Sequence, residues 1–206
     1  NLSLARTGAA HLVAVPPARA DMAPAGMRVL DVETVDNRGL MFPMRPDEGQ
    51  TTAAGHPIGN DVTADLAIRR AVNLALDREA LVALALAGHG RPAFGPVDGL
   101  PWDNPEAHLP SGDPASAMAV LEAAGWQDAD GDGIRERGDR AAGFTIVYPA
   151  SDSTRQALAL GAAQQLQAVG IAADPSGRSW DEIEAMMHSN VVVFGWGAHD
   201  PLEVWS

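Results

Sequence analysis

The 206-residue sequence contains no cysteine and no lysine, and each absence excludes a class of chemistry. Without thiols there is no disulfide framework, no thiolate nucleophile and no Cys-ligated zinc or iron–sulfur site. Without lysine there is no Schiff-base amine and no phosphate-loop lysine. The 14 basic residues are therefore all arginine, against 27 acidic residues. The formal net charge of -13 argues against nucleic acid as a partner, because phosphates need a basic surface.

Long hydrophobic runs and common enzyme motifs are also missing. No stretch approaches the roughly 20 apolar residues of a membrane span. The sequence has no G-x-S-x-G elbow, no phosphate loop and no G-x-G-x-x-G fingerprint. No two of the six histidines have the i, i+4 spacing of a helical zinc motif. We therefore expect a protein that is not an enzyme, since a hydrolase would need a nucleophile–base pair that the sequence does not show.

The hydropathy pattern predicts alternating strands and helices. Helices are expected at 18–23, 64–76, 78–87, 114–124, 153–169 and 179–188. Strands are expected at 12–15, 27–32, 38–42, 144–148, 171–173 and 191–194. Capping boxes at 153–156 and 179–182 mark the starts of two helices. The β-α-β-α-β order of the last third predicts an α/β architecture with helices packed on a sheet.

An acidic loop follows the fourth of these helices and resembles a calcium-binding loop. Aspartates occupy positions 1, 3, 5 and 12 of the EF-hand pattern, and Gly133 occupies position 6. We predict a structural calcium ion held by Asp128, Asp130, Asp132, Ile134 and Asp139. Asp139 reaches less far than the usual glutamate, and the flanks are one helix end and a strand rather than two long helices. The alternative is a solvated acidic turn that is partly neutralised by Arg135, Arg137 and Arg140.

A turn rich in small residues follows the last expected strand and includes Trp196. Ligand sites in α/β sheets favour the carboxyl ends of strands. Small neighbours leave room for a bound molecule, and an indole offers a flat apolar wall with one N–H donor. Trp196 is therefore a candidate ligand-binding residue. The alternative is a core tryptophan followed by an ordinary turn.

Taken in order, several segments resemble one family, the large extracellular solute-binding proteins of ABC importers that carry dipeptides, oligopeptides or nickel complexes. The segments are 40–42, 68–79, 95–96, 117–126, 130–136, 170–171 and 196–201. The resemblance implies a lobe of the type II periplasmic-binding-protein fold, α/β with a mixed sheet and packed helices. Residues 1–35 then correspond to the tail end of the first lobe and the hinge crossing. Residues 36–206 correspond to the second lobe, which ends at the return hinge, so we expect a fragment of a longer protein.

The same resemblance implies a function. The expected role is to capture a peptide or related small solute between two lobes and to deliver it to an ABC permease. The protein would be a monomer in the periplasm or at the extracellular face of a bacterial membrane, and it would require no cofactor.

The resemblance also implies ligand-binding residues after Trp196. In peptide-binding members an acidic residue shortly after this tryptophan pairs with the peptide's amino terminus. Here His199 takes that place and Asp200 follows one position later, so both are candidate ligand-binding residues. His199 keeps open the alternative of a nickel- or metallophore-binding member of the family. The remaining alternative is a structural module that calcium stabilises and that has no transport role.

Overall fold

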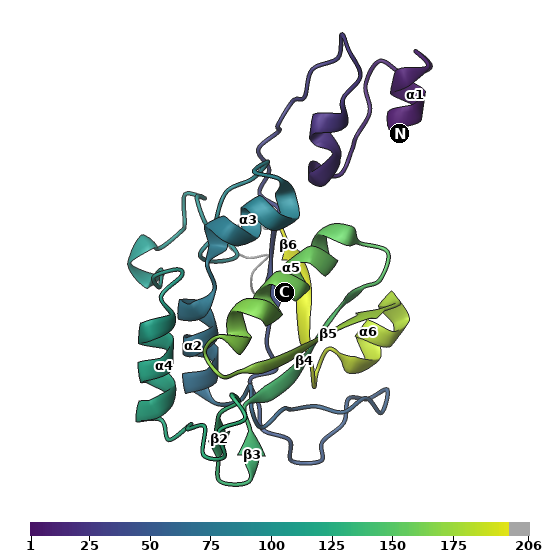
Figure 1. Cartoon of the computed structure of the whole chain (residues 1–206). Helices are drawn as coiled ribbons and strands as arrows, with labels where there is room; N and C mark the ends of the chain where they lie inside the picture. The colour runs from purple at the N-terminus through teal and green to yellow at the C-terminus, as the bar shows by residue number, and fades with distance from the viewer. Residues whose placement is uncertain (198–206) are drawn as a thin grey trace.

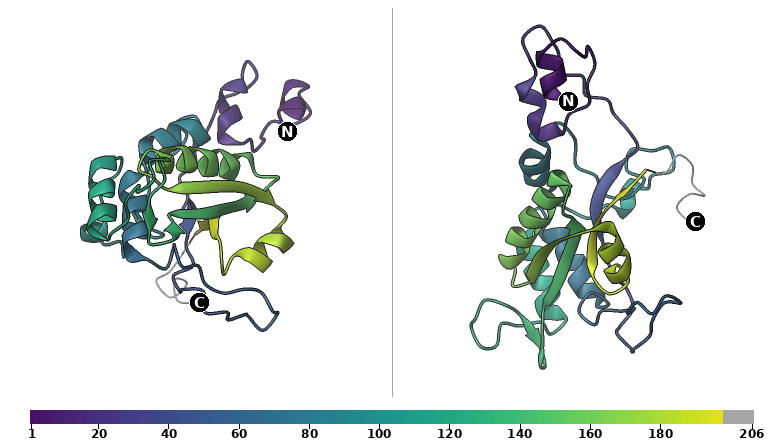
Figure 2. Two further views of the ribbon diagram at one scale, coloured as in Figure 1. Left: turned by 60° about the horizontal axis from the view of Figure 1, so that its bottom comes forward. Right: turned by 90° about the vertical axis from the view of Figure 1, so that its right-hand side faces the viewer.

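The structure is a computed structural model that describes residues 1–197 (Figures 1 and 2). Its helices, 3-10 helices (η) and strands are, in order, α1 (Leu2–Arg6), η1 (Pro17–Met22), β1 (Asn37–Met41), α2 (Leu66–Ala75), α3 (Arg78–Leu86), η2 (Pro105–Ala107), α4 (Pro114–Ala123), β2 (Glu136–Arg137), β3 (Arg140–Ala141), β4 (Gly143–Pro149), α5 (Ser153–Gln167), β5 (Ala172–Arg178), α6 (Trp180–Met186) and β6 (Val191–Trp196). Among these described helices, none is both long enough and apolar enough to cross a membrane.

A mixed four-stranded sheet with packed helices confirms the predicted α/β class. The strand order is β1-β6-β4-β5. β4 runs parallel to both β5 and β6, whereas β1 runs antiparallel to β6. A separate hairpin of β2 and β3 follows the acidic loop and projects at the bottom of Figure 1. The chain thus enters the sheet at an edge strand and returns beside that strand in β6.

The sheet is covered on both faces, which explains the uninterrupted apolar runs of its central strands. Ile146 of β4 belongs to the larger core, which α2, α4 and α5 share. Its neighbour Val147 points to the other face and packs with Ile183 of α6 and Val192 of β6. Ile146, Val147 and Val192 are fully buried, and Ile183 is nearly so. The parallel strands are therefore fixed by packing from both sides.

One of the two predicted capping boxes is wrong. Asp152, which lies one residue before the predicted box at 153–156, is the N-cap of α5. Its Oδ1 accepts the backbone N–H groups of Thr154 and Arg155, each at 3.0 Å. A carboxylate is a stronger acceptor than a serine hydroxyl, so the cap moves upstream. The second box, at 179–182, is confirmed with both of its reciprocal hydrogen bonds.

The first 36 residues contain no strand, so two sequence predictions fail there. The segments 12–15 and 27–32 are irregular, and Leu12 and Val32 are 84% and 77% exposed. Their apolar alternation finds no partner strand among the described residues, and a lone strand leaves its backbone groups unpaired. The segment lies at the top of Figure 1, beyond α3. A 3-10 helix, η1, forms where the helix at 18–23 was predicted, and it packs against α3.

Candidate ligand-binding surface

The carboxyl ends of the three parallel strands lie at one edge of the sheet. β4 ends at Pro149, β5 at Arg178 and β6 at Trp196. Trp196 is also the register partner of Asn37, the first residue of β1. The edge therefore lies where the N-terminal segment joins the sheet (Figure 2). Ligands of α/β proteins bind outside the carboxyl ends of strands, so this edge is the candidate surface.

Gly195 of β6 allows two arginine side chains to pass close to the strand. A Cβ atom at this position would lie 2.5 Å from Arg38 Nη1 and 3.1 Å from Arg155 Nη2. Any other residue would force the Arg38 guanidinium to move. Arg38 comes from β1 and Arg155 from the first turn of α5. The glycine thus lets positive charges from two distant parts of the sequence meet at the edge of the sheet.

Arg155 is mostly buried and only partly paired. Its side chain is 16% exposed, and its Nη1 donates a 2.6 Å hydrogen bond to Asp152 Oδ2. Its Nε is buried and has no hydrogen-bond partner among the described residues. A buried donor without an acceptor costs about 1–3 kcal/mol, so an acceptor supplied by a ligand would recover that energy.

Asp152 is held in its charged form. Burial disfavours the ionised carboxyl group, but the backbone N–H and the guanidinium of Arg155 and the backbone N–H of Thr154 favour it. The hydrogen bonds and the charge outweigh burial, and the pKa of Asp152 lies below its ordinary value. The carboxylate of Asp152 is therefore ionised at neutral pH.

A hollow of about 370 Å³ lies beside this pair. It is bounded by the turn at 149–155, by Trp180 and by Pro16 of the N-terminal segment. Trp180 is 44% exposed, and the centre of its ring lies 5.6 Å from the guanidinium carbon of Arg155. The ring meets that of Phe194 edge to face, with centres 6.5 Å apart. The hollow combines an arginine that can bind a carboxylate with an aromatic wall for an apolar group.

The acidic loop lies at the other end of the molecule, between α4 and the β2–β3 hairpin (Figure 1). Asp128 bonds across the loop, because its Oδ1 and Oδ2 accept the N–H groups of Gly131 and Gly133 at 2.8 and 3.1 Å. Both glycines have positive φ, which permits these tight turns. The loop is therefore shaped by its own carboxylates.

Two of the predicted calcium ligands come together in this loop. Oxygens of Asp128, Asp130 and Glu136 lie within 4.8 Å of one another. Glu136 replaces the predicted Asp139 in this group, while Asp132 Oδ1 instead accepts the N–H of Ile134 at 2.7 Å. Calcium binding by this group stays a prediction.

Arg135 and Arg137 of the loop, and Arg140 directly after it, make their ion pairs with residues outside the loop. The pairs are Arg135 with Glu122, Arg137 with Asp65, and Arg140 with Asp61. Among the described residues these three side chains make no direct ion pair with the loop aspartates, and a solvated acidic turn stays the alternative to a calcium site. Backbone N–H groups, rather than arginines, bond to the loop carboxylates.

A model of the bacterial extracellular solute-binding proteins, family 5 Middle, matches residues 1–204 of the sequence. The chain belongs to this family. Its members are periplasmic or extracellular solute-binding proteins of bacterial ABC transporters for peptides and nickel.

Two curated proteins are similar to this solute-binding protein in sequence. Protein XP55 of Streptomyces lividans is 41% identical over 144 residues, which cover 69% of this chain and 26% of that protein. The oligopeptide-binding protein AppA of Bacillus subtilis is 29% identical over 145 residues, which cover 66% of this chain and 27% of AppA. The chain thus spans about a quarter of the length of the curated relatives it matches.

Solved structures of type II periplasmic binding proteins share the fold. NikZ from Campylobacter jejuni, in complex with Ni(L-His), superposes with a TM-score of 0.69 at 24% identity over 82% of this chain and 31% of NikZ. AppA, in complex with a nonapeptide, superposes with a TM-score of 0.67 at 22% identity over 95% of this chain and 38% of AppA. The predicted fold class is confirmed.

The described residues include one of the three predicted ligand-binding residues. Trp196 is the last residue of β6, so it lies at the carboxyl end of the strand rather than in the turn predicted after it, while His199 and Asp200 lie outside the described residues. Sequence analysis missed Arg155 and Arg38. Arg155 could have been found, since it lies in the first helical turn after a buried strand. Arg38 carries no local signal, because its position depends on the pairing of β1 with β6.

Proposed function

We propose that this solute-binding protein captures a peptide, or a related small solute with a free carboxylate, at the carboxyl-end edge of its sheet. The supporting observation is the pair of guanidinium groups beside Gly195, one of which keeps a buried N–H without an acceptor. Guanidinium groups bind carboxylates through parallel hydrogen bonds. Trp180 would cover an apolar side chain of the same ligand. The role needs neither a catalytic step nor a cofactor.

The proposed mechanism is closure of two lobes around the ligand. Residues 1–35 would belong to the end of the first lobe and the hinge, and residues 36–206 to the second lobe. A ligand that contacts both lobes stabilises the closed state, because only closure makes all contacts at once. The closed monomer, in the periplasm or at the outer face of the membrane, would then dock on an ABC permease. Pro16 beside the Asp152–Arg155 turn supports a ligand position between the two parts.

The second candidate is a nickel complex or a metallophore. It is favoured by the structural similarity to NikZ, which was solved with Ni(L-His). His199 would then be the first metal-binding residue to test. Membership of a solute-binding family favours either transport role over a structural module that calcium stabilises.

Native mass spectrometry of the full-length protein, purified gently without chelator, distinguishes the two ligands. A spread of co-purifying peptide masses would support the proposed peptide ligand and would make Asp200 the candidate partner of the peptide's amino group. A single nickel-containing mass would overturn the peptide proposal in favour of the nickel complex.

A variant pair tests the surface itself. Arg155→Gln removes the guanidinium from the hollow, and Arg178→Gln removes the same charge from the end of β5, outside the hollow. Loss of a charged hydrogen bond costs about 1.5–3 kcal/mol, so Arg155→Gln should weaken binding of a co-purified peptide about tenfold or more. Arg178→Gln should leave the affinity near that of wild type. Equal affinities of both variants, measured by calorimetry, would refute this position for the ligand.

A further inference from the structure

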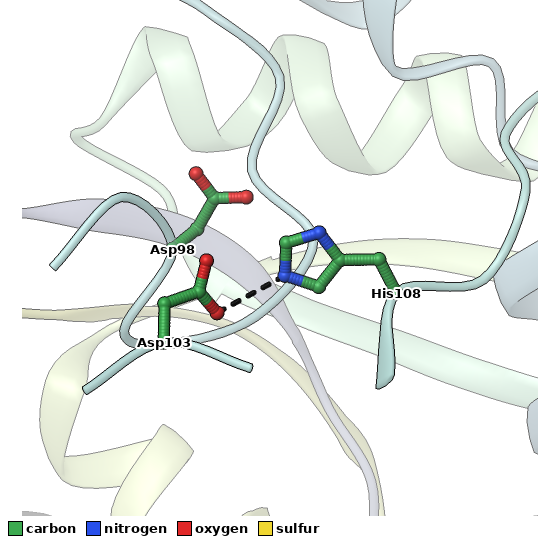
Figure 3. A group of neighbouring side chains, drawn as sticks. All are labelled: Asp98, Asp103 and His108. Atoms are coloured by element: carbon green, nitrogen blue, oxygen red, sulfur yellow. Dashed lines mark hydrogen bonds and ion pairs between the residues drawn. The ribbon is translucent and has the colours of Figure 1, made fainter. Parts of the chain in front are cut away.

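Three metal-ligating side chains come together in the segment between α3 and α4 (Figure 3). His108 Nε2 lies 3.0 Å from Asp103 Oδ1. One ligand atom each of Asp98, Asp103 and His108 lies within 4.8 Å of the other two. Their side chains are 9%, 13% and 23% exposed, so the group is largely withdrawn from bulk water.

Neighbouring residues hold these side chains in orientation. Asp98 Oδ2 accepts the N–H of Phe94 at 2.8 Å, and Asp98 Oδ1 accepts a hydrogen bond from Arg91 Nη1. The Phe94 ring stacks on the His108 imidazole, with centres 5.2 Å apart and planes inclined by 15°. Metal ligands in proteins are commonly fixed by such surrounding hydrogen bonds and packing. The group therefore has a built support and is not a chance encounter of surface side chains.

The hydrogen bond between His108 and Asp103 does not include Asp98, which Arg91 and the N–H of Phe94 hold separately. Two carboxylates held this close repel each other when both are ionised. Arg91 offsets part of that repulsion, but its side chain is 52% exposed and also pairs with Glu33 at 3.5 Å. A dication between the two carboxylates and the imidazole would balance the charges from inside the group.

We propose that Asp98, Asp103 and His108 bind one Zn²⁺ ion through one carboxylate oxygen each and through Nε2. An imidazole with two carboxylates is a donor set that zinc accepts. Ligands of a tetrahedral zinc ion at about 2.1 Å lie about 3.4 Å apart, so the observed separations need only small side-chain adjustments. Water would complete the coordination.

A zinc ion at this site would restrict the motion of the segment between α3 and α4, which reaches the candidate ligand surface. Most of the chain between α3 and α4 is irregular, with only the short η2 within it. The carbonyl of Pro96 in this segment accepts a 2.9 Å hydrogen bond from Asn37 Nδ2, at the start of β1. A bound ion would therefore restrict the loop that supports the first residue of the sheet. This role does not depend on which solute the protein carries.

Zinc titration of the full-length protein, stripped with EDTA and dialysed, tests the proposal by isothermal calorimetry. We expect one tight Zn²⁺ per chain that is lost or weakened at least about tenfold in His108→Gln, because a ligand is removed. His89→Gln is the matched control, since His89 Nδ1 also lies 3.0 Å from a carboxylate, that of Asp31, but belongs to no such three-residue group among the described residues. Its zinc affinity should equal that of wild type.

A second variant and spectroscopic measurements show whether a loss of zinc binding comes from the lost ligand or from misfolding of the variant. Asp103→Asn nearly preserves shape and should also weaken zinc binding, while circular dichroism checks that each variant retains its secondary structure. Co²⁺ in the site should give a visible absorption band in wild type that His108→Gln lacks. The proposal is overturned if wild type binds no ion at about 100 µM Zn²⁺, or if folded His108→Gln binds zinc as tightly as His89→Gln does.

Discussion

Trp126 Nε1 donates a 2.9 Å hydrogen bond to Asp65 Oδ2, and this contact joins three parts of the fold. Asp65 Oδ1 caps α2 by accepting the N–H of Ala67 at 2.8 Å. The same carboxylate pairs with Arg137 Nη1 of the β2–β3 hairpin at 2.6 Å. Trp126, which follows α4, is fully buried. One side chain thus connects the start of α2, the end of α4 and the hairpin.

Asp65→Ala is expected to be strongly destabilising, because it removes a helix cap and leaves a buried indole N–H without an acceptor. These losses together correspond to about 2–4 kcal/mol of unfolding free energy. Asp77→Ala is the matched control, since Asp77 caps α3 through Ala80 and lies at a more exposed site. The control should lose about 1 kcal/mol. Urea unfolding measures both values, and equal losses would contradict the linking role of Asp65.

Gly195→Ala is expected to impair ligand binding more than stability. The added methyl group would lie 2.5 Å from Arg38 Nη1, so the guanidinium must move away from its place beside Gly195 and Arg155. We expect peptide affinity to fall about tenfold, the loss of one charged hydrogen bond. Gly39→Ala is a control in the same sheet, because a Cβ atom there has no neighbour within 4 Å. Calorimetry that finds the same affinity in both variants would remove Arg38 from the ligand surface.

The helix starts were largely predictable, and the meeting of distant side chains was not. Asp77 and Asp113 cap α3 and α4 as the local pattern indicates, since a cap depends on residues three positions away. The strand predicted at 27–32 fails because a strand also needs a partner, which short-range alternation cannot reveal.

Side-chain groups from separate segments carry no periodic signal at all. Arg38 and Arg155 meet only through the pairing of β1 with β6. Asp98, Asp103 and His108 lie on an irregular segment, where spacing along the sequence says nothing about distance in space. By contrast, Trp196 was predictable because the carboxyl end of a buried strand fixes its place.

Because of Asp152, the unfolding free energy of the protein should decrease at acidic pH. The pKa of this carboxyl group is lower in the folded protein than the unfolded value of about 3.9, so its stabilising effect is complete above that pH. The effect is lost as the pH falls through the lowered folded pKa. Wild type should therefore exceed Asp152→Asn in unfolding free energy at neutral pH, and the difference should shrink below about pH 4. Urea unfolding across this range checks it, and a pH-independent difference would disprove the linkage.

Calcium is expected to stabilise the protein through the acidic loop, independently of the zinc site. Ca²⁺ prefers several oxygen ligands, and carboxylates of Asp128, Asp130 and Glu136 already lie within 4.8 Å of one another. A ligand at about 100 times its Kd adds about 2.7 kcal/mol of stability, which a thermal melt detects. Asp130→Asn should reduce the Ca²⁺-induced rise in Tm, whereas His108→Gln should leave it unchanged. If both variants keep the Ca²⁺-induced rise in Tm, the calcium binds elsewhere. If wild type shows no such rise, backbone N–H groups alone satisfy the carboxylates of the loop.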